Sequence, residues 1–180
     1  MKLPLCYYGH PLLRQKALAI EAITPEVVRL AEDMIETMLS YDNAIGFAAT
    51  QLGANLRIFV IREEKFQENG TYRFQEPEVF INPMISNPSK EIEVMDEGCM
   101  SLPNLTCSVP RPKKIRIAYQ NLKGERKEEE VEGFRARMLM HENDHLNGVL
   151  IIDRTTPRER KKLEAELQLL KKKYANTASA

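Results

Sequence analysis

Apolar residues recur every three or four positions between residues 25 and 39, the spacing of one face of an α-helix. The helix start is marked by Thr24, Pro25 and Glu26, since a hydroxyl, a proline and an acid in this order favour a helix N-terminus. We therefore predict a helix from about residue 25. Its buried stripe would consist of Val27, Leu30, Ala31, Met34, Ile35, Met38 and Leu39.

Shorter apolar runs bounded by turn-forming residues predict β-strands in the middle of the chain. Asn121-Leu122-Lys123-Gly124 should join the last two strands as a hairpin, and Glu68-Asn69-Gly70 should form a turn after the first. The small residues of 42–51 predict a loop or an irregular strand. The predicted strands are residues 57–62, 79–82, 92–95, 114–119 and 128–132.

Two more helices are predicted towards the C-terminus. One begins at about Arg135 and should stop near Asn147-Gly148, and the other follows Thr156-Pro157. The apolar stripe of the last helix is Leu163, Leu167, Leu170 and Tyr174. Because helices and strands do not alternate regularly, we predict an α+β fold, with small, mostly antiparallel sheets packed around the second helix and a C-terminal helix beside them.

Composition narrows the class of protein. The chain has 180 residues, of which 43% are hydrophobic and 29% charged, which indicates a folded globular protein. The 26 basic and 26 acidic residues cancel, so net charge gives no reason to expect a nucleic-acid partner. We find no signal peptide, no membrane-spanning run and no paired cysteine motif, so we expect a cytoplasmic protein with reduced thiols and no membrane partner.

The segment His141-Glu142-Asn143-Asp144-His145 predicts a metal site. Residues four apart share a helix face, so both imidazoles could bind one ion, and Glu142 could move the proton of a water molecule that the ion activates. The alternative is a solvated helix face that carries two histidines. The chain contains only three histidines, and two of them flank this glutamate, which favours the metal site.

Two histidines need a third protein ligand. No histidine follows His145, so the candidates are acids in the last helix (Glu159, Glu164 and Glu166) and a cysteine. We favour Cys99, because Glu97-Gly98-Cys99-Met100-Ser101 is a glycine-containing turn directly after a predicted strand. The alternative for Cys99 is a small buried apolar side chain, as we expect for Cys6 and Cys107.

Together these motifs resemble those of peptide deformylases. The resemblance covers roughly residues 5–155, and makes residues 1–155 the catalytic domain and residues 156–180 its C-terminal helical extension. The segments that carry it are Ala44-Ile45-Gly46-Phe47-Ala48-Ala49-Thr50-Gln51, Glu97-Gly98-Cys99-Met100-Ser101 and His141-Glu142-Asn143-Asp144-His145, with Tyr8-Gly9-His10-Pro11-Leu12-Leu13-Arg14 and Leu146-Asn147-Gly148-Val149-Leu150 in support.

The resemblance implies a reaction and roles for residues. The reaction is removal of the N-formyl group from the initiator methionine of nascent chains, with release of formate. Cys99, His141 and His145 would hold one ion per chain, Fe²⁺ by preference, with Zn²⁺, Ni²⁺ or Co²⁺ as substitutes. Glu142 would transfer the proton. The Gln51 amide and the Met100 backbone N–H would stabilise the oxyanion.

The resemblance also implies how substrate binds. The peptide would pair with Ile45 and Gly46 as an added strand alongside the Ala44–Phe47 segment. Its methionine side chain would enter a pocket that includes Phe134, Met138 and His141. These three residues could equally be plain core.

This chain departs from the family pattern at three positions. Ala44 stands where most members have glycine, which predicts a shifted or narrowed loop because alanine resists positive φ. Met140 and Met100 replace a common glutamine and a common leucine. Asp144 is expected to orient a metal ligand through a hydrogen bond.

The C-terminal extension suggests a further partner. Residues 157–175 contain seven basic and three acidic residues, a net charge of 7 − 3 = +4. Related bacterial enzymes dock a C-terminal helix on ribosomal RNA, so this helix is a candidate for ribosome docking. The alternative is that the lysines complement the negative end of the helix dipole.

Three other functions remain open from the sequence. A zinc endopeptidase would need a ligand after His145 in place of Cys99. A ribosome-associated module that binds metal without catalysis would not release formate. An iron-sensing regulator has little support, because we find no DNA-reading motif. We expect the protein to be a monomer.

Overall fold

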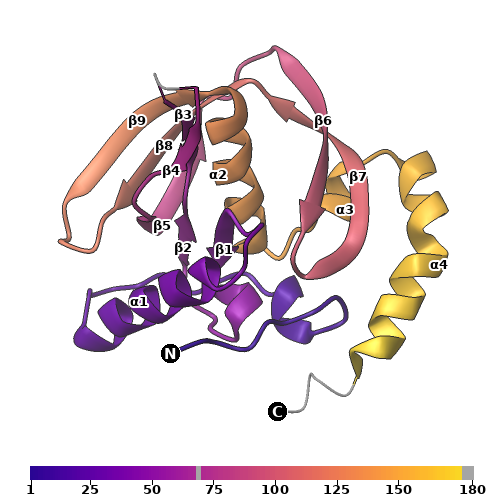
Figure 1. The fold of residues 1–180 in the computed structure, drawn as a ribbon, viewed down its shortest axis with the longest axis horizontal. Helices are drawn as coiled ribbons and strands as arrows, with labels where there is room; N and C mark the ends of the chain where they lie inside the picture. Colours follow the sequence, from indigo (N-terminus) through magenta and orange to yellow (C-terminus); the bar gives the residue numbers. More distant parts are fainter. Residues whose placement is uncertain (68–69, 176–180) are drawn as a thin grey trace.

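A five-stranded antiparallel sheet, in the order β1-β2-β5-β8-β9, forms one side of the molecule (Figure 1). The computed structural model describes residues 1–67 and 70–175, so Glu68 and Asn69 of the predicted turn, and residues 176–180 of the expected extension, lie outside the described residues. The elements in chain order are η1 (Pro11–Arg14), α1 (Pro25–Leu39), β1 (Gly46–Ala48), η2 (Ala49–Leu52), β2 (Ile58–Ile61), β3 (Glu64–Phe66), β4 (Tyr72–Phe74), β5 (Glu78–Ser86), β6 (Ile92–Cys99), β7 (Leu102–Pro112), β8 (Lys114–Gln120), β9 (Arg126–Glu132), α2 (Gly133–His145), α3 (Ile151–Arg154) and α4 (Pro157–Lys173).

Strand β2 shows why the sheet is covered by helices on both faces. Its side chains alternate: Ile58 and Val60 belong to the core cluster under α1, whereas Phe59 and Ile61 belong to the cluster under α2. All four are fully buried, which explains a continuous apolar run in place of an alternating one. The sheet therefore fixes α2 on the face opposite α1.

A separate two-stranded ribbon, β6 and β7, lies on the other side of α2 (Figure 1). The apolar residues of β7 share a third core cluster with η1, α3 and α4, in which Leu105, Val109 and Leu167 are buried. Helix α2 is thus held between the sheet and the ribbon. Residues from both can reach it.

The predicted α+β fold is confirmed, with antiparallel sheets around α2 and a C-terminal helix. Helix α1 begins at Pro25, the β8–β9 hairpin forms as predicted, and α4 begins after Thr156, whose hydroxyl accepts a hydrogen bond from the Glu159 N–H. The segment predicted as a loop or an irregular strand contains the short strand β1 and the 3-10 helix η2. Five further elements were not predicted: η1, α3, β3, β4 and β7.

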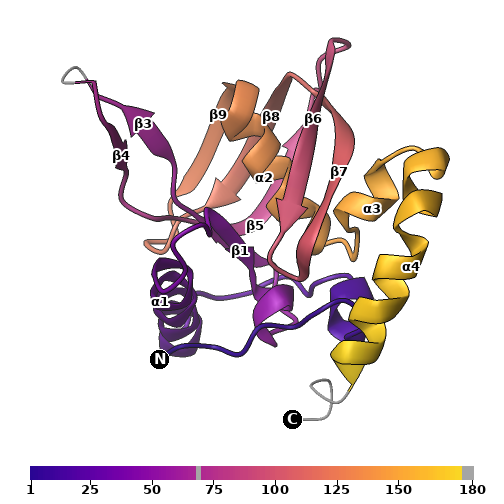
Figure 2. The same cartoon turned by 45° about the vertical axis from the view of Figure 1, so that its right-hand side comes forward.

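The β3–β4 hairpin projects from the body of the molecule (Figure 2). Its strands are exposed along their whole length, including Phe66 and Tyr72. Among the residues that the structure describes, no helix is both long and apolar enough to cross a membrane.

Candidate active site

Three side chains converge at one point between α2 and the ribbon. The Nε2 atoms of His141 and His145 are 3.3 Å apart, and the Cys99 Sγ atom lies 3.3 Å from the His145 Nε2. All three donor atoms lie within 4.8 Å of one another, so they could hold one metal ion. Two imidazoles and a thiolate suit Fe²⁺ and Zn²⁺ alike. The glutamates considered as alternative ligands lie on α4 and are not part of this cluster.

Cys99 reaches the histidines because it ends β6 at an irregularity. The β6–β7 register shifts between Gly98 and Cys99, where the chain turns into β7. A bulge of this kind re-aims a side chain locally. His145 needs no such device, because it lies one helical turn after His141. Burial lowers the pKa of His145 well below its usual value and so favours the neutral imidazole, the form that binds metals.

Glu97 orients the first histidine. Its Oε2 lies 3.0 Å from the His141 Nδ1, so an Nδ1–H that donates to it leaves the Nε2 lone pair for an ion. Arg111 donates to both Glu97 oxygens, at 2.6 and 2.9 Å, and Arg137 donates to the Oε1 at 2.6 Å. Burial opposes ionisation of Glu97, but the hydrogen bonds from Arg111 and His141 outweigh it and hold the pKa of this carboxyl well below its usual value.

Asp144 does not contact a metal ligand with its side chain, contrary to the sequence-based expectation. Its carboxylate accepts hydrogen bonds from Arg111, at 2.9 Å, and from Arg154. The aspartate therefore acts on His141 indirectly, through Arg111 and Glu97. The reason is geometric: the next residue along a helix points about 100° away, so Asp144 faces β7 while His145 faces the cluster.

Glu142 lies on α2 beside β1. Its Oε2 is buried and has no hydrogen-bond partner within the described part of the chain. A Cβ on Gly46 would come within 2.6 Å of the other oxygen, Oε1, so the glycine leaves space for this carboxylate. Burial raises the pKa of Glu142 to about 7. A nearby cation would lower that pKa, because it favours the carboxylate.

The Gln51 amide is fixed with its NH₂ group towards the cluster. Its Oε1 accepts a hydrogen bond from the Ala48 N–H at 2.9 Å. Because an N–H can only donate, the atom facing Ala48 must be the amide oxygen. The Nε2 therefore faces the Ser101 Oγ at 3.1 Å and the Cys99 Sγ at 3.5 Å. Met100 lies between Cys99 and Ser101 in sequence and lines the cavity that contains the cluster.

A cavity of about 680 Å³ opens onto the cluster. Phe134, Met138 and His141 all line it, as the spacing along one helix face predicts; Phe134 is 55% exposed and Met138 is buried. Ala44, Ile45 and Gly46 line it from the sheet side. The structure thus brings every sequence-predicted site residue except His145 to the lining of one cavity; His145 lies behind Cys99, with its Nε2 3.3 Å from the Sγ.

Ala44 causes no backbone strain. The non-glycine residues with positive φ, among those described, are Asn82, Asn87 and Asn104. Ala44 is not one of them, its side chain is buried in the α1 core cluster, and its carbonyl accepts a hydrogen bond from Arg62 at 2.7 Å. Ala44 thus has an ordinary backbone conformation, as expected for an alanine, and a shifted or narrowed loop stays a prediction.

The fold and the site together define a metal-dependent hydrolase with one thiolate and two imidazole ligands. The chain belongs to the peptide deformylase family, since the model of the polypeptide deformylase family matches residues 2–161. Its function is removal of the formyl group from an N-terminal methionine, and the Cys-His-His metal site of that activity is present.

Individual relatives agree with this assignment. The chain is 42% identical to the peptide deformylase of Thermotoga neapolitana over 160 residues, which are 89% of this chain and 91% of the relative. A plant peptide deformylase structure superposes with a TM-score of 0.84 at 31% identity, covering 99% of this chain and 94% of the other. The Acinetobacter baumannii enzyme, solved with Met-Ala-Ser bound, gives a TM-score of 0.77 at 31% identity, covering 86% and 98%.

The sequence motifs include Glu97 and Ser101 without indicating a role for either, and they do not include Arg111. A signal for Glu97 was present: it stands two residues before Cys99 at the end of a strand, and residues two apart share a strand face. Arg111 had no such signal, because β7 was not predicted.

Proposed function

We propose that Glu142 is the group that transfers the proton during deformylation. When bound, the ion supplies a Lewis acid that acidifies water and polarises the formyl carbonyl. Glu142 takes the proton of the attacking water and delivers it to the departing amine. The observation that carries this role is the buried, unpaired Oε2 of Glu142, on the helix that bears both histidines. A buried carboxylate oxygen without a partner is suited to exchange a proton with a bound water or substrate.

We further propose that Gln51 and Met100 stabilise the negative charge that develops on the formyl oxygen when water adds to the formyl carbon. The Gln51 NH₂ group is already oriented by the Ala48 N–H and held within 3.5 Å of the Cys99 Sγ. The Met100 backbone N–H follows Cys99 directly in the chain, at the turn between β6 and β7. Donors that are fixed before the reaction need no reorganisation when the charge develops.

The peptide substrate is proposed to lie along Ala44–Phe47 as an added strand. Strand β1 is an edge strand of the five-stranded sheet. Among the described residues no strand pairs with its outer edge, so a peptide could add there as a further strand. The Met-Ala-Ser complex of the Acinetobacter baumannii enzyme supports a peptide of this kind as the ligand. Its methionine side chain would occupy the part of the cavity lined by Phe134, Met138 and His141.

We propose Fe²⁺ as the ion, one per chain, with Zn²⁺, Ni²⁺ or Co²⁺ as substitutes. We also propose a cytoplasmic monomer, with residues 1–155 as the catalytic domain and the C-terminal extension attached to it. All of the proposed site residues come from a single chain, which supports a monomer, and nascent chains are made in the cytoplasm.

Docking of α4 on ribosomal RNA is proposed as a second partner interaction. It is supported by the exposure of six basic side chains, Arg158, Lys161, Lys162, Lys171, Lys172 and Lys173, whereas Arg160 turns back to Asp153. Replacement of Lys171, Lys172 and Lys173 by glutamate should weaken ribosome co-sedimentation more at low salt than at high salt. Unchanged co-sedimentation would remove this proposal.

The decisive experiment combines metal analysis with formate release from a formyl-Met peptide, using protein prepared without air, since oxygen oxidises Fe²⁺ and thiolates. We expect one ion per chain and rapid formate release. Cys99→Ala should lose both, whereas Glu164→Ala should keep both. A Cys99→Ala protein that retains its ion and cleaves internal peptide bonds would favour an endopeptidase. Wild-type protein with bound Fe²⁺ that releases no formate would favour a module without catalytic activity.

A further inference from the structure

Two tyrosines near the ends of the described chain meet at the cavity. The rings of Tyr7 and Tyr174 are stacked, with centroids 3.8 Å apart and an interplanar angle of 12°. Both residues line the cavity that contains Cys99, His141 and Glu142. The helical spacing alone predicts no more for Tyr174 than a position in the apolar stripe of the last helix.

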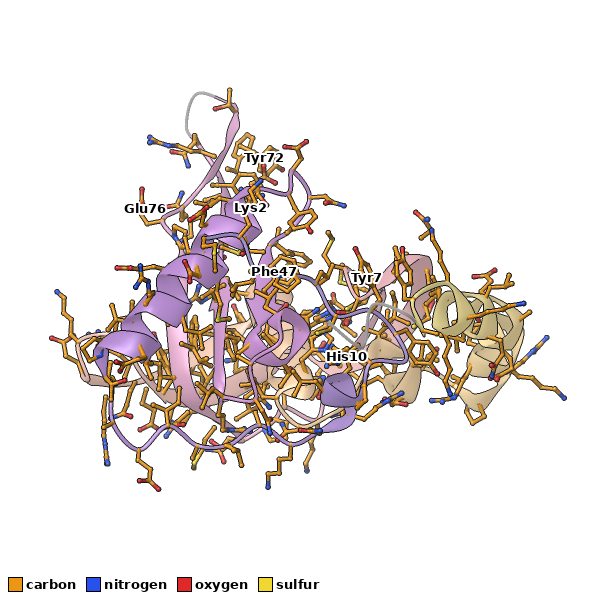
Figure 3. All side chains as sticks on the ribbon, turned by 90° about the horizontal axis from the view of Figure 1, so that it is seen from below. Lys2, Tyr7, His10, Phe47, Tyr72 and Glu76 are labelled. Atoms are coloured by element: carbon orange, nitrogen blue, oxygen red, sulfur yellow. The ribbon has the colours of Figure 1, made fainter. Side chains whose placement is uncertain are left out.

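Tyr7 is fixed on the cavity side by the segment that carries it. The Cys6 N–H donates to the Gln51 carbonyl at 2.7 Å, and the Tyr8 N–H donates to the Ser101 carbonyl at 2.9 Å. Cys6 and Tyr8 pack in the core cluster of the ribbon, and the alternation of an extended chain then turns Leu5 and Tyr7 to the cavity. Figure 3 labels Tyr7 between the body of the molecule and α4.

Tyr174 is positioned by the docking of α4. Leu163, Leu167 and Leu170 pack on the ribbon cluster, and Leu167 is 1% exposed. The helix end lies close to the N-terminal segment, because a Cβ on Gly9 would come within 3.0 Å of the Lys171 Cγ. Tyr174 directly follows Lys173, the last residue of α4. The docked end of the helix therefore brings its ring against that of Tyr7.

We propose that the stacked Tyr7–Tyr174 pair is a specificity-determining wall for the part of the peptide that follows the formylmethionine, and that it favours an aromatic or large apolar side chain there. This inference rests on the proposed function. If the methionine side chain of the substrate occupies the α2 side of the cavity, the substrate residues that follow it leave the cavity along the rest of its lining. One side of that lining is apolar and aromatic, with Leu5, Tyr7, Tyr41 and Tyr174, whereas the rest includes polar residues such as Asn43, Asn104 and Thr106.

The wall makes the C-terminal helix part of the active site. A deletion of α4 would therefore alter peptide turnover as well as any ribosome binding. Replacement of the lysines by glutamate leaves Tyr174 in place and so tests ribosome binding separately. The wall also predicts that the effect of the pair depends on peptide length.

The test compares two substrates, formyl-Met-Ala and formyl-Met-Ala-Phe. We expect Tyr174→Ala and Tyr7→Ala to lower kcat/KM for the longer peptide about 3- to 10-fold, mainly through KM, the size of one lost aromatic contact. For the shorter peptide the change should be less than about 2-fold. Tyr174→Phe should behave as wild type, because stacking does not need the hydroxyl. Tyr72→Ala, an exposed tyrosine of β4, is the matched control and should change neither value.

The outcomes separate a wall from a structural role. Equal losses on both peptides, or no loss on either, overturn the wall. If Tyr174→Ala does not fold, Tyr174→Leu retains an apolar residue that can pack and should still lose activity selectively on the longer peptide; a loss shared by both peptides overturns the proposal. Wild-type protein that releases formate from neither peptide overturns the proposed function, and the wall with it.

Discussion

The missing side chain of Gly46 makes room for the carboxylate of Glu142. A Cβ at position 46 would lie 2.6 Å from the Glu142 Oε1, 2.9 Å from its Cδ and 3.0 Å from its Cγ. Gly46 does not have positive φ, so its conformation alone does not require glycine. The requirement comes from the neighbouring helix, which presents its acid to the first residue of β1.

Gly46→Ala should displace Glu142 and lower kcat/KM for a formyl-Met peptide by roughly 10²-fold, because an error of about 1 Å in a catalytic group has costs of this order. The bound metal should remain, since the three ligands are untouched. Gly98→Ala is the matched control: its Cβ would meet Thr106 at 3.6 Å, an ordinary contact, and its loss should be much smaller. Equal losses in the two variants would contradict the displacement.

Glu142→Gln should keep the fold and the ion but release formate about 10²- to 10⁴-fold more slowly, the usual contribution of a general acid–base. Glutamine has nearly the same shape and cannot transfer the proton. Metal content and thermal unfolding of the variant establish that the site is intact. A variant with near wild-type kcat would show that another group moves the proton.

Ala44→Gly should have little effect on activity, less than about 3-fold, although it introduces the glycine that the family resemblance leads one to expect there. Ala44 has no strained backbone to relieve, and its methyl group is buried with the α1 cluster. Removing this methyl group and loosening the chain should cost about 1 kcal/mol of unfolding free energy. Measured urea unfolding and formate release check both statements. A large gain in kcat would mean that Ala44 constrains the substrate loop.

Arg111→Ala should destabilise the protein by up to about 3–5 kcal/mol, because each of two buried carboxylates loses one of its two arginine partners. Arg111 is 3% exposed and bridges Glu97 and Asp144. The comparison is Arg116→Ala, which removes an exposed pair with Glu128 and should cost less than about 1 kcal/mol. Similar urea midpoints for the two variants would rule out a special role for the buried arginine.

Acid should remove the contribution of Asp153 to stability. Burial opposes ionisation of this carboxyl, but hydrogen bonds from Arg14, the Leu150 N–H and Arg160 outweigh it, and its pKa lies below the ordinary 3.8. A carboxyl with a lower pKa in the folded chain stabilises it above its unfolded pKa and loses that effect as pH falls through the folded value. The unfolding free energy of wild type minus that of Asp153→Asn should thus be constant above about pH 5 and shrink below pH 4. A difference that grows in acid would contradict this sign.

The parts of the fold that were predicted from sequence have one periodic apolar face or a strong end signal. Helix α1 has both. Strand β7 was missed because it contains Pro103, Pro110 and Pro112, which usually argue against a strand. A two-stranded ribbon tolerates them, since each strand has only one paired edge. The β3–β4 pair has no buried face, so it shows no alternation to detect.

The site was predictable only where local spacing carries it. His141, Glu142 and His145 follow from helix geometry, and Cys99 from a turn after a strand. The Glu97–Arg111–Asp144 network joins two strands and a helix, and no local pattern reports such long-range pairing. Helix α2 itself buries Arg137 and Asp144, so burial of charge blurs the apolar stripe that would otherwise mark it.

The distribution of the metal ligands over two substructures has a mechanical consequence. Cys99 ends a strand of the ribbon, whereas both histidines belong to the helix that packs on the sheet. An ion bound by all three is a cross-link between these layers, and its binding free energy adds to the docking of the ribbon. Loss of the ion should therefore abolish catalysis and, at the same time, remove one of the interactions that hold the ribbon against α2.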